Sequence, residues 1–162
     1  MDKEKNFIKS QISSNLQDIA TLIDTGVFGV QILRLFQEPV FVSLILKLHD
    51  LLQKLKQLKC RVNFTDDIPN GDITDLVSKI RNAICHLDSG ENILDKESQL
   101  KFVFGMIIGK VTAIAKDEED LAKSDYNDDI AFFYGTHRIY LKRHIIRVLN
   151  EAQKKVQELF PD

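Results

Sequence analysis

The sequence of 162 residues is poor in the residue types that define unusual structural classes: it has two cysteines, three prolines and seven glycines. Cys60 and Cys85 form no C-x-x-C pair and are too few for a disulfide framework, so we expect a reduced intracellular protein. With 28% charged residues and so few glycines, the collagen-like and low-complexity classes are excluded. The length allows one domain, residues 1–162, with enough chain to bury a core.

A long hydrophobic run is also missing. The densest apolar stretch, Val40 to Leu46, is interrupted by Ser43, bounded by Glu38 and Lys47, and too short to span a bilayer. Residues 1–5 are charged and lead into no apolar signal-peptide core. These features predict a soluble, cytoplasmic protein without a membrane partner.

Neither sign of charge is in excess, because 22 Lys and Arg face 24 Asp and Glu, for a formal net charge of -2. This balance excludes a globally basic nucleic-acid binder, so any contact with RNA requires a local patch. The charges are nevertheless segregated. Residues 117–129 hold seven acids and one Lys, which predicts a solvated loop, and no further acid occurs until Glu151.

Apolar residues recur with the period of an amphipathic helix over most of the chain. Pro39 is expected to break or kink one of these helices. Asp72, with Asp75 three residues later, is a plausible N-cap, and Gly90 a plausible stop. The expected helices run from about Glu4 to Asp24, from near Gly29 to Pro39, from Val40 to about Lys59, over 72–88, and from about His137 to Leu159.

The segment from Leu100 to Ala115 is rich in β-branched and aromatic residues around Gly109-Lys110. It predicts a small hairpin, with a helix as the alternative. Residues 130–134 are a candidate third strand, closed by Gly135. The predicted fold is therefore mainly α, a bundle of four to five helices with a small β-hairpin insertion near residues 100–135.

The predicted helix 72–88 carries the hexad Arg81-Asn82-Ala83-Ile84-Cys85-His86. On a wheel at about 100° per residue, Arg81, Asn82 and His86 lie away from the apolar side. His86 is thus expected to be exposed rather than a core histidine. A plain solvated helix face is the alternative interpretation. The apolar side comprises Ile73, Val77, Ile80, Ile84 and Leu87.

These three residue types suit cleavage of RNA by its own 2′-OH. Histidine can transfer protons near neutral pH. Arginine can stabilise a phosphorane with two hydrogen bonds, and asparagine can orient the histidine or contact a phosphate. One histidine per chain supplies one of the two proton transfers, whereas a symmetric dimer supplies both.

The R-N-x-x-x-H hexad on the penultimate long helix resembles the signature of the HEPN superfamily (higher eukaryotes and prokaryotes nucleotide-binding). Residues 128–135 and 138–144 also resemble prokaryotic members. The resemblance implies a HEPN-like helical bundle, a homodimer with facing motif helices, and a metal-independent, cofactor-free endoribonuclease of the toxin–antitoxin or phage-defence type. The catalytic Arg, polar residue and His carry over onto Arg81, Asn82 and His86.

The chain departs from the toxins of this superfamily that pair with a nucleotidyltransferase antitoxin. Those toxins often carry a Tyr two residues after the His, where this chain has Asp88. Control by nucleotide transfer to that Tyr is therefore not expected. An antitoxin that is a protein or an RNA remains open.

The acid-free interval before Glu151 holds a second candidate surface. On a wheel for the predicted last helix, Tyr140, Arg143, His144 and Arg147 share an outward face. Together with Lys142, the arginines would hold phosphates and Tyr140 would stack on a base. The alternative is a solvated face balanced by the acids of 117–129.

The sequence thus predicts an endoribonuclease that cleaves RNA in a composite site at a dimer interface. A non-catalytic HEPN-like module that binds RNA, a nucleotide or a partner protein is the alternative. A purely structural helical dimer is a third possibility. The spacing of His, Cys and acidic residues indicates no metal site.

Overall fold

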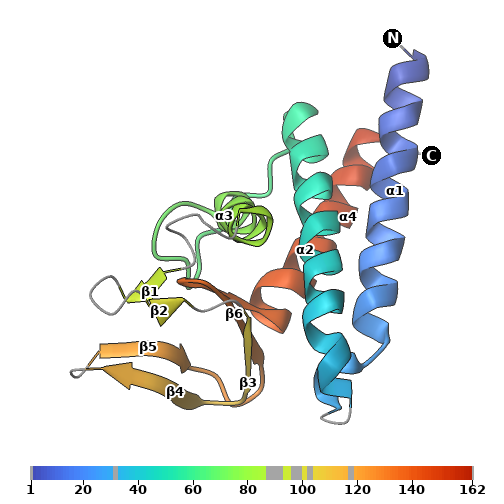
Figure 1. The fold of residues 1–162 in the computed structure, drawn as a ribbon. Helices are drawn as coiled ribbons and strands as arrows, with labels where there is room; N and C mark the ends of the chain where they lie inside the picture. Colours follow the sequence, from blue (N-terminus) through green and yellow to red (C-terminus); the bar gives the residue numbers. More distant parts are fainter. Residues whose placement is uncertain are drawn as a thin grey trace. The chain divides into compact units, whose positions relative to one another are not determined.

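A computed structural model describes residues 2–30, 33–86, 93–95, 100–101, 104–116 and 119–161. The chain divides into two compact units (Figure 1). Unit 1 comprises Met1–Val77 and Val148–Asp162, and unit 2 comprises Ser78–Arg147. The structure is rich in helix with small antiparallel sheets, which confirms the coarse fold class.

The first helix of unit 1, α1 (Asp2–Asp24), confirms the prediction for this segment. Its inner side includes Ile12 and Ile19, which are fully buried at the predicted helical spacing. The helix ends at Asp24, and Gly26 just beyond it has a φ of 66°, in the left-handed region that glycine adopts without strain. A short 3-10 turn, η1 (Val27–Gly29), follows.

The second helix, α2 (Arg34–Gln57), runs through Pro39. A break or a kink is expected at this proline; the helix does not break there, and the expected helix start near Gly29 is wrong. Pro39 is exposed, and the buried side of α2 continues from Gln37 before it to Phe41 after it. Proline has no N–H, so the helix loses one backbone hydrogen bond at this position. Burial of side chains on both sides of Pro39 stabilises the helix enough to offset that loss. The buried side of α2 consists of Gln37, Phe41, Leu44, Ile45, Leu48, Leu51, Leu52 and Leu55.

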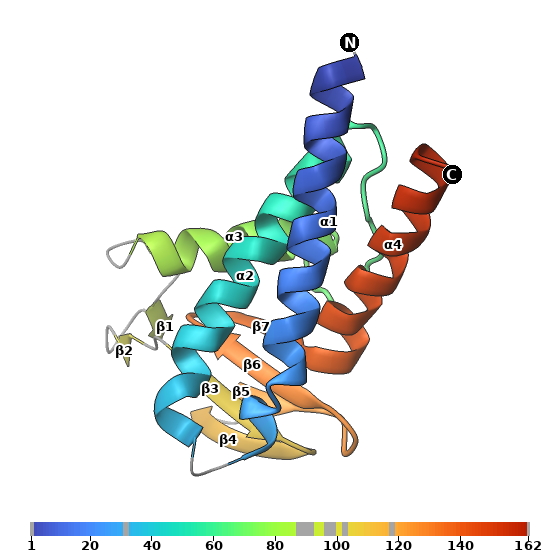
Figure 2. The same cartoon turned by 90° about the vertical axis from the view of Figure 1, so that its right-hand side faces the viewer.

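Helices α1 and α2 form an antiparallel hairpin, and α4 (Arg147–Leu159) lies beside α1 (Figures 1 and 2). Asn15 Nδ2 donates to Asp50 Oδ2 at 2.6 Å, and Lys47 Nζ lies 2.7 Å from Asp18 Oδ2. Lys9 Nζ lies 5.3 Å from the ring centroid of Phe160, just beyond α4. These contacts join the helices of unit 1.

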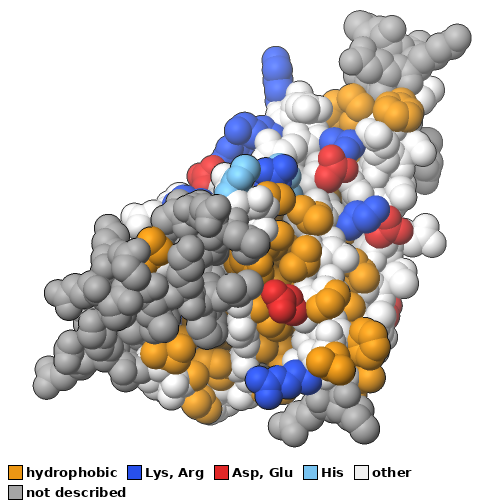
Figure 3. Space-filling view, in the orientation of Figure 1, with side chains coloured by type: hydrophobic (Ala, Val, Ile, Leu, Met, Phe, Trp, Pro, Cys, Tyr) orange, Lys and Arg blue, Asp and Glu red, His pale blue; other side chains and the backbone are white. Residues whose placement is uncertain are grey.

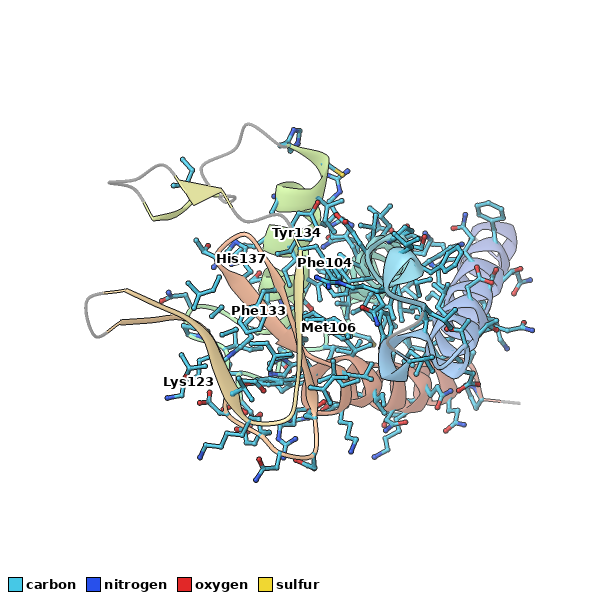
Figure 4. All side chains as sticks on the ribbon, turned by 60° about the horizontal axis from the view of Figure 1, so that its bottom comes forward. Phe104, Met106, Lys123, Phe133, Tyr134 and His137 are labelled. Atoms are coloured by element: carbon cyan, nitrogen blue, oxygen red, sulfur yellow. The ribbon has the colours of Figure 1, made fainter. Side chains whose placement is uncertain are left out.

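Unit 2 is built mainly from strands: β1 (Ile93–Asp95), β2 (Leu100–Lys101), β3 (Gly105–Ile108), β4 (Val111–Lys116), β5 (Glu119–Ser124), β6 (Ile130–Tyr134) and β7 (His137–Tyr140). They form the antiparallel sheet β3-β6-β7 and the antiparallel pairs β1-β2 and β4-β5. In the three-stranded sheet, Met106 pairs with Phe132, and Phe132 with Ile139. Met106, Phe133 and His137 mark its three strands in Figure 4. The predicted strand over 130–134 is confirmed as β6.

The hairpin predicted around Gly109-Lys110 is wrong, although both flanking segments are strands. Gly109 turns the chain with a φ of 80°, and its N–H donates to the carbonyl oxygen of Asp129 at 3.0 Å. Strand β3 then pairs with β6, while β4 pairs with β5. The turn thus joins two strands that take different partners.

Two further boundaries differ from the prediction. The solvated loop expected over 117–129 contains strand β5, because pairing with β4 uses backbone groups and needs no apolar sequence. The last helix does not begin at His137, because His137–Tyr140 is strand β7. A π-helix, η4 (Leu141–Ile146), follows and leads into α4.

The core of unit 2 includes a hydrophobic cluster with residues from the sheet β3-β6-β7 and from the pair β4-β5. Its buried members are Ala122, Ala131, Phe133 and Tyr140, with Ile107, Ile114 and Tyr126 packed against them. Cross-strand register places Ile107, Ala131 and Tyr140 in one row. Since paired residues project to the same side of a sheet, this row forms one apolar face.

Candidate functional site

The helix that carries the hexad, α3 (Ile73–Cys85), begins at the predicted residues. Asp72 Oδ1 accepts a hydrogen bond from the N–H of Asp75 at 3.0 Å, and Asp75 Oδ2 accepts one from the N–H of Asp72 at 3.4 Å. This reciprocal pair satisfies two N–H groups that the first turn leaves unpaired. The start of α3 is therefore fixed by its own sequence.

Arg61 ties the preceding loop to the start of α3. Its Nε and Nη2 donate to the two carboxylate oxygens of Asp72 at 2.7 and 2.8 Å, and Nη2 also donates to Asp75 at 2.6 Å. Hydrogen bonds to Asp72 and Asp75 raise the pKa of Arg61. Burial would raise the pKa of Asp72, but the hydrogen bonds from Arg61 outweigh it and lower that pKa. Sequence analysis missed this clamp because the residues are eleven or more positions apart.

The described hexad residues lie as the wheel predicts. Asn82 and His86 are exposed and Arg81 is half-buried, while Ile80 and Ala83 are fully buried. Arg81 Nη1 donates to Asn82 Oδ1 at 3.3 Å. The N–H of His86 donates to the carbonyl oxygen of Asn82 at 2.9 Å, which puts His86 one helical turn beyond Asn82. Arg81 and Asn82 thus lie in the last turns of α3, and His86 follows directly after the helix, which ends at Cys85 rather than at the predicted residue 88.

The neighbourhood of the hexad is only partly described. Cys85 is exposed and free, one turn after Arg81. The apolar position Leu87, the departure at Asp88 and the predicted stop at Gly90 lie outside the described residues. The second set of predicted site residues also belongs to unit 2, with Tyr140 on β7, Lys142, Arg143 and His144 on η4, and Arg147 at the start of α4.

For Tyr140 and His144, the predicted outward orientation is wrong, because both side chains are fully buried. The Tyr140 ring lies in the core cluster, with Tyr126 edge-on at 5.1 Å and His144 at 5.5 Å between ring centroids. Its hydroxyl accepts a hydrogen bond from the N–H of Asp125 at 3.1 Å. Burial raises the pKa of Tyr140. In this conformation Tyr140 cannot stack on a base.

Arg143 is held by the acids that precede β6. Its Nη1 donates to Asp129 Oδ2 at 3.0 Å and its Nη2 to Asp128 Oδ1 at 2.9 Å. The guanidinium carbon lies 3.6 Å from the ring centroid of Tyr126, a cation–π contact. The hydrogen bond from Arg143 lowers the pKa of Asp128. The charge of Arg143 is thus balanced within unit 2.

The other basic residues of this interval differ in their surroundings. Arg138 Nη1 donates to Asp125 Oδ2 at 2.8 Å and to the carbonyl oxygen of Lys123 at 2.6 Å. Lys142 is exposed, and Arg147 is half-buried. The alternative interpretation, in which the acids of 117–129 balance these cations, accounts for Arg138 and Arg143.

Two apolar side chains are exposed in the first turn of α2, where Leu35 is 88% and Phe36 59% exposed. Figure 3 shows one face of the molecule, on which hydrophobic side chains are exposed among charged ones. None of the described helices is long and apolar enough to cross a membrane. Among the side chains described, no group of three or more His, Cys, Asp or Glu could hold a metal ion.

Comparisons of the chain with protein-family models, with curated proteins and with solved structures give no match.

Proposed function

We propose that the chain is a metal-independent endoribonuclease of the toxin or phage-defence type, with a HEPN-like site at Arg81, Asn82 and His86. The observation that best supports this proposal is their arrangement at the C-terminal end of α3, where Asn82 in the last turn and His86 just after the helix are exposed. The hydrogen bond from Arg81 to Asn82 holds a cation beside the face that carries His86. The three residue types proposed for 2′-OH attack are therefore close together in the chain, with Arg81 and Asn82 in the last turns of α3 and His86 directly after it.

In the proposed reaction, His86 removes the proton of a 2′-OH, whose oxygen attacks the adjacent phosphorus. The bond from phosphorus to the 5′-oxygen breaks, and this oxygen takes a proton from the second His86 of a homodimer. Arg81 stabilises the negative charge of the phosphorane, and Asn82 holds Arg81 in place. The products are a 2′,3′-cyclic phosphate, which can open to a 3′-phosphate, and a 5′-OH end.

Binding of the RNA backbone is assigned to the cations near η4. Lys142 is exposed and can meet a phosphate directly. Arg143 would have to exchange Asp128 for a phosphate, and Arg147 completes the proposed set. The exposed Leu35 and Phe36 support a protein partner, either a second copy or an antitoxin, because exposed apolar clusters are typical of contact surfaces.

The test is digestion of RNA in EDTA by the wild type, His86→Ala and Arg81→Ala, with end-group analysis of the products. We expect the wild type to cleave and each variant to lose about 100-fold or more in rate. Cys85→Ser is the matched control, because Cys85 lies on the same helix, is exposed and has no assigned role. It should retain the wild-type rate.

Equal cleavage by the wild type and both variants would remove Arg81 and His86 from the site. Binding of RNA by the wild type without cleavage over long incubation would replace the proposal with a non-catalytic binding module. Expression of the wild type should also halt growth, and His86→Ala should relieve that arrest.

A further inference from the structure

The junction between strand β7 and the C-terminal helix is held by side chains rather than by regular secondary structure. Tyr140 is extended, with φ of -96° and ψ of 145°, and is the N-cap residue of the π-helix η4, but its side chain makes no capping hydrogen bond. Asp129 instead accepts hydrogen bonds from the N–H groups of Lys142 at 2.8 Å and Arg143 at 3.1 Å. The N–H of Tyr140 donates to a different acceptor.

His144 supplies the acceptor for the N–H of Tyr140. The N–H of Tyr140 donates to His144 Nδ1 at 3.1 Å, and the His144 side chain is fully buried. A ring nitrogen can accept a hydrogen bond only when it carries no proton. The geometry therefore assigns His144 as a neutral ring whose proton is on Nε2. A second proton on Nδ1 would turn this hydrogen bond into a contact between two donors.

Several titratable or charged residues lie on the strands that pack against η4. Strands β6 and β7 both contact η4, and their titratable or charged residues are Tyr134, His137, Arg138 and Tyr140. The carboxylates next to this junction are already engaged. Asp125 binds Arg138, Asp128 binds Arg143, and Asp129 binds Arg143 and the start of η4.

We propose that His144 makes the junction between β7 and η4 acid-sensitive, so that it is closed while His144 is neutral and opens when His144 takes up a proton. This inference does not depend on the proposed nuclease. The unfolded or opened chain binds one more proton than the native chain, so stability rises with pH in this window. The stabilisation by neutral His144 is fully present above the ordinary pKa of histidine, near 6.5. It is lost as the pH falls below that value.

The test compares the wild type with His144→Asn in the full chain. Asparagine places an oxygen near the position of Nδ1, so it keeps an acceptor for Tyr140 but cannot titrate there. Denaturant unfolding is followed from pH 7.5 to pH 5. Below about pH 6.5 the unfolding equilibrium constant of the wild type should rise up to about tenfold per pH unit more than that of the variant. His137→Asn on β7 should follow the wild type.

Parallel pH profiles for the wild type and His144→Asn would overturn the proposal. A second measurement needs no variant. In nitrogen-15 NMR of the native wild type, the His144 ring should show the neutral form with its proton on Nε2 throughout the folded range. A charged His144 ring in a chain that keeps its native amide spectrum would also overturn the proposal.

Discussion

Asp129 shows how much of the C-terminal junction depends on one carboxylate. The side chain is fully buried, and its two oxygens accept hydrogen bonds from the N–H groups of Ile130, Lys142 and Arg143 and from the Arg143 guanidinium. A carboxylate with several donors around it is stable in a buried position. Asp129 thus acts as a helix cap that comes from a distant part of the sequence.

Replacement of this carboxylate should be costly. We expect Asp129→Asn to lower the free energy of unfolding by about 2–4 kcal/mol, because an amide presents donors to groups that are themselves donors and leaves Arg143 without a buried partner. Denaturant unfolding at pH 7 measures the change. Asp128→Asn removes the exposed partner of the same arginine and should cost less than about 1 kcal/mol. Similar losses in both variants would show that Asp129 is no cap.

Among the elements, those specified by neighbouring residues were predictable. Helix α1 follows from a repeat of isoleucines, β6 from its apolar run, and α3 from its stripe together with Asp72 and Asp75. The exposure of Asn82 and His86 followed from the same wheel. In each case the deciding residues are within four positions of one another.

Elements that depend on distant partners were not predictable. Strand β5 exists because β4 pairs with its backbone, and its acidic sequence gives no sign of it. The wheel drawn for the last helix failed at Tyr140 because that residue is in a strand. It failed at His144 because the ring is buried where it accepts the N–H of Tyr140, a contact between β7 and η4 that a helical wheel does not contain. The clamp by Arg61 is likewise a long-range contact.

The first turn of α3 offers a test of how tightly this element is held. Gly71 has a φ of 94°, and a Cβ atom there would lie 2.9 Å from Asp75 Oδ2, which is part of the cap. Gly71→Ala should therefore destabilise the protein by about 1–3 kcal/mol in thermal or denaturant unfolding.

Gly29 gives the matched control for this helix start. A Cβ atom there would have no neighbour within 4 Å, and its backbone is not in the left-handed region. Gly29→Ala should change the free energy of unfolding by less than about 0.5 kcal/mol. Equal effects at both glycines would mean that the turn before α3 adapts to a side chain.

Across the whole molecule, the near-zero net charge conceals pairs formed within each unit. In unit 1, Arg61 binds Asp72 and Asp75, and in unit 2 Arg143 binds Asp128 and Asp129. Several carboxylates consequently have a lowered pKa. They include Asp50, where burial opposes the hydrogen bonds from Lys54 and Asn15 that lower the pKa, and Asp72.

These lowered pKa values predict acid denaturation in a window well below that of His144. A carboxyl group whose pKa is lower in the folded state stabilises the fold above its ordinary pKa, near 3.9, and loses that contribution as the pH falls further. The free energy of unfolding of the wild type should thus fall between about pH 4 and pH 2. Asp72→Asn should be less stable at pH 7 and lose less over this window.

Asp18→Asn removes an exposed partner of Lys47 and is the control for this window. Between pH 4 and pH 2 the free energy of unfolding of this variant should fall as steeply as that of the wild type. If Asp72→Asn lost as much stability between pH 4 and pH 2 as the wild type, the Arg61 clamp would not be a source of the acid sensitivity.

Unit 1 combines residues 1–77 with 148–162, whereas unit 2 is one continuous segment. A ribosome must therefore synthesise all of unit 2 before α4 emerges. Every strand of unit 2 can find its partner while α1 and α2 still lack α4. Although domains of nascent chains usually fold from the N-terminus onward, here the N-terminal helices can complete their unit only after α4 has been synthesised.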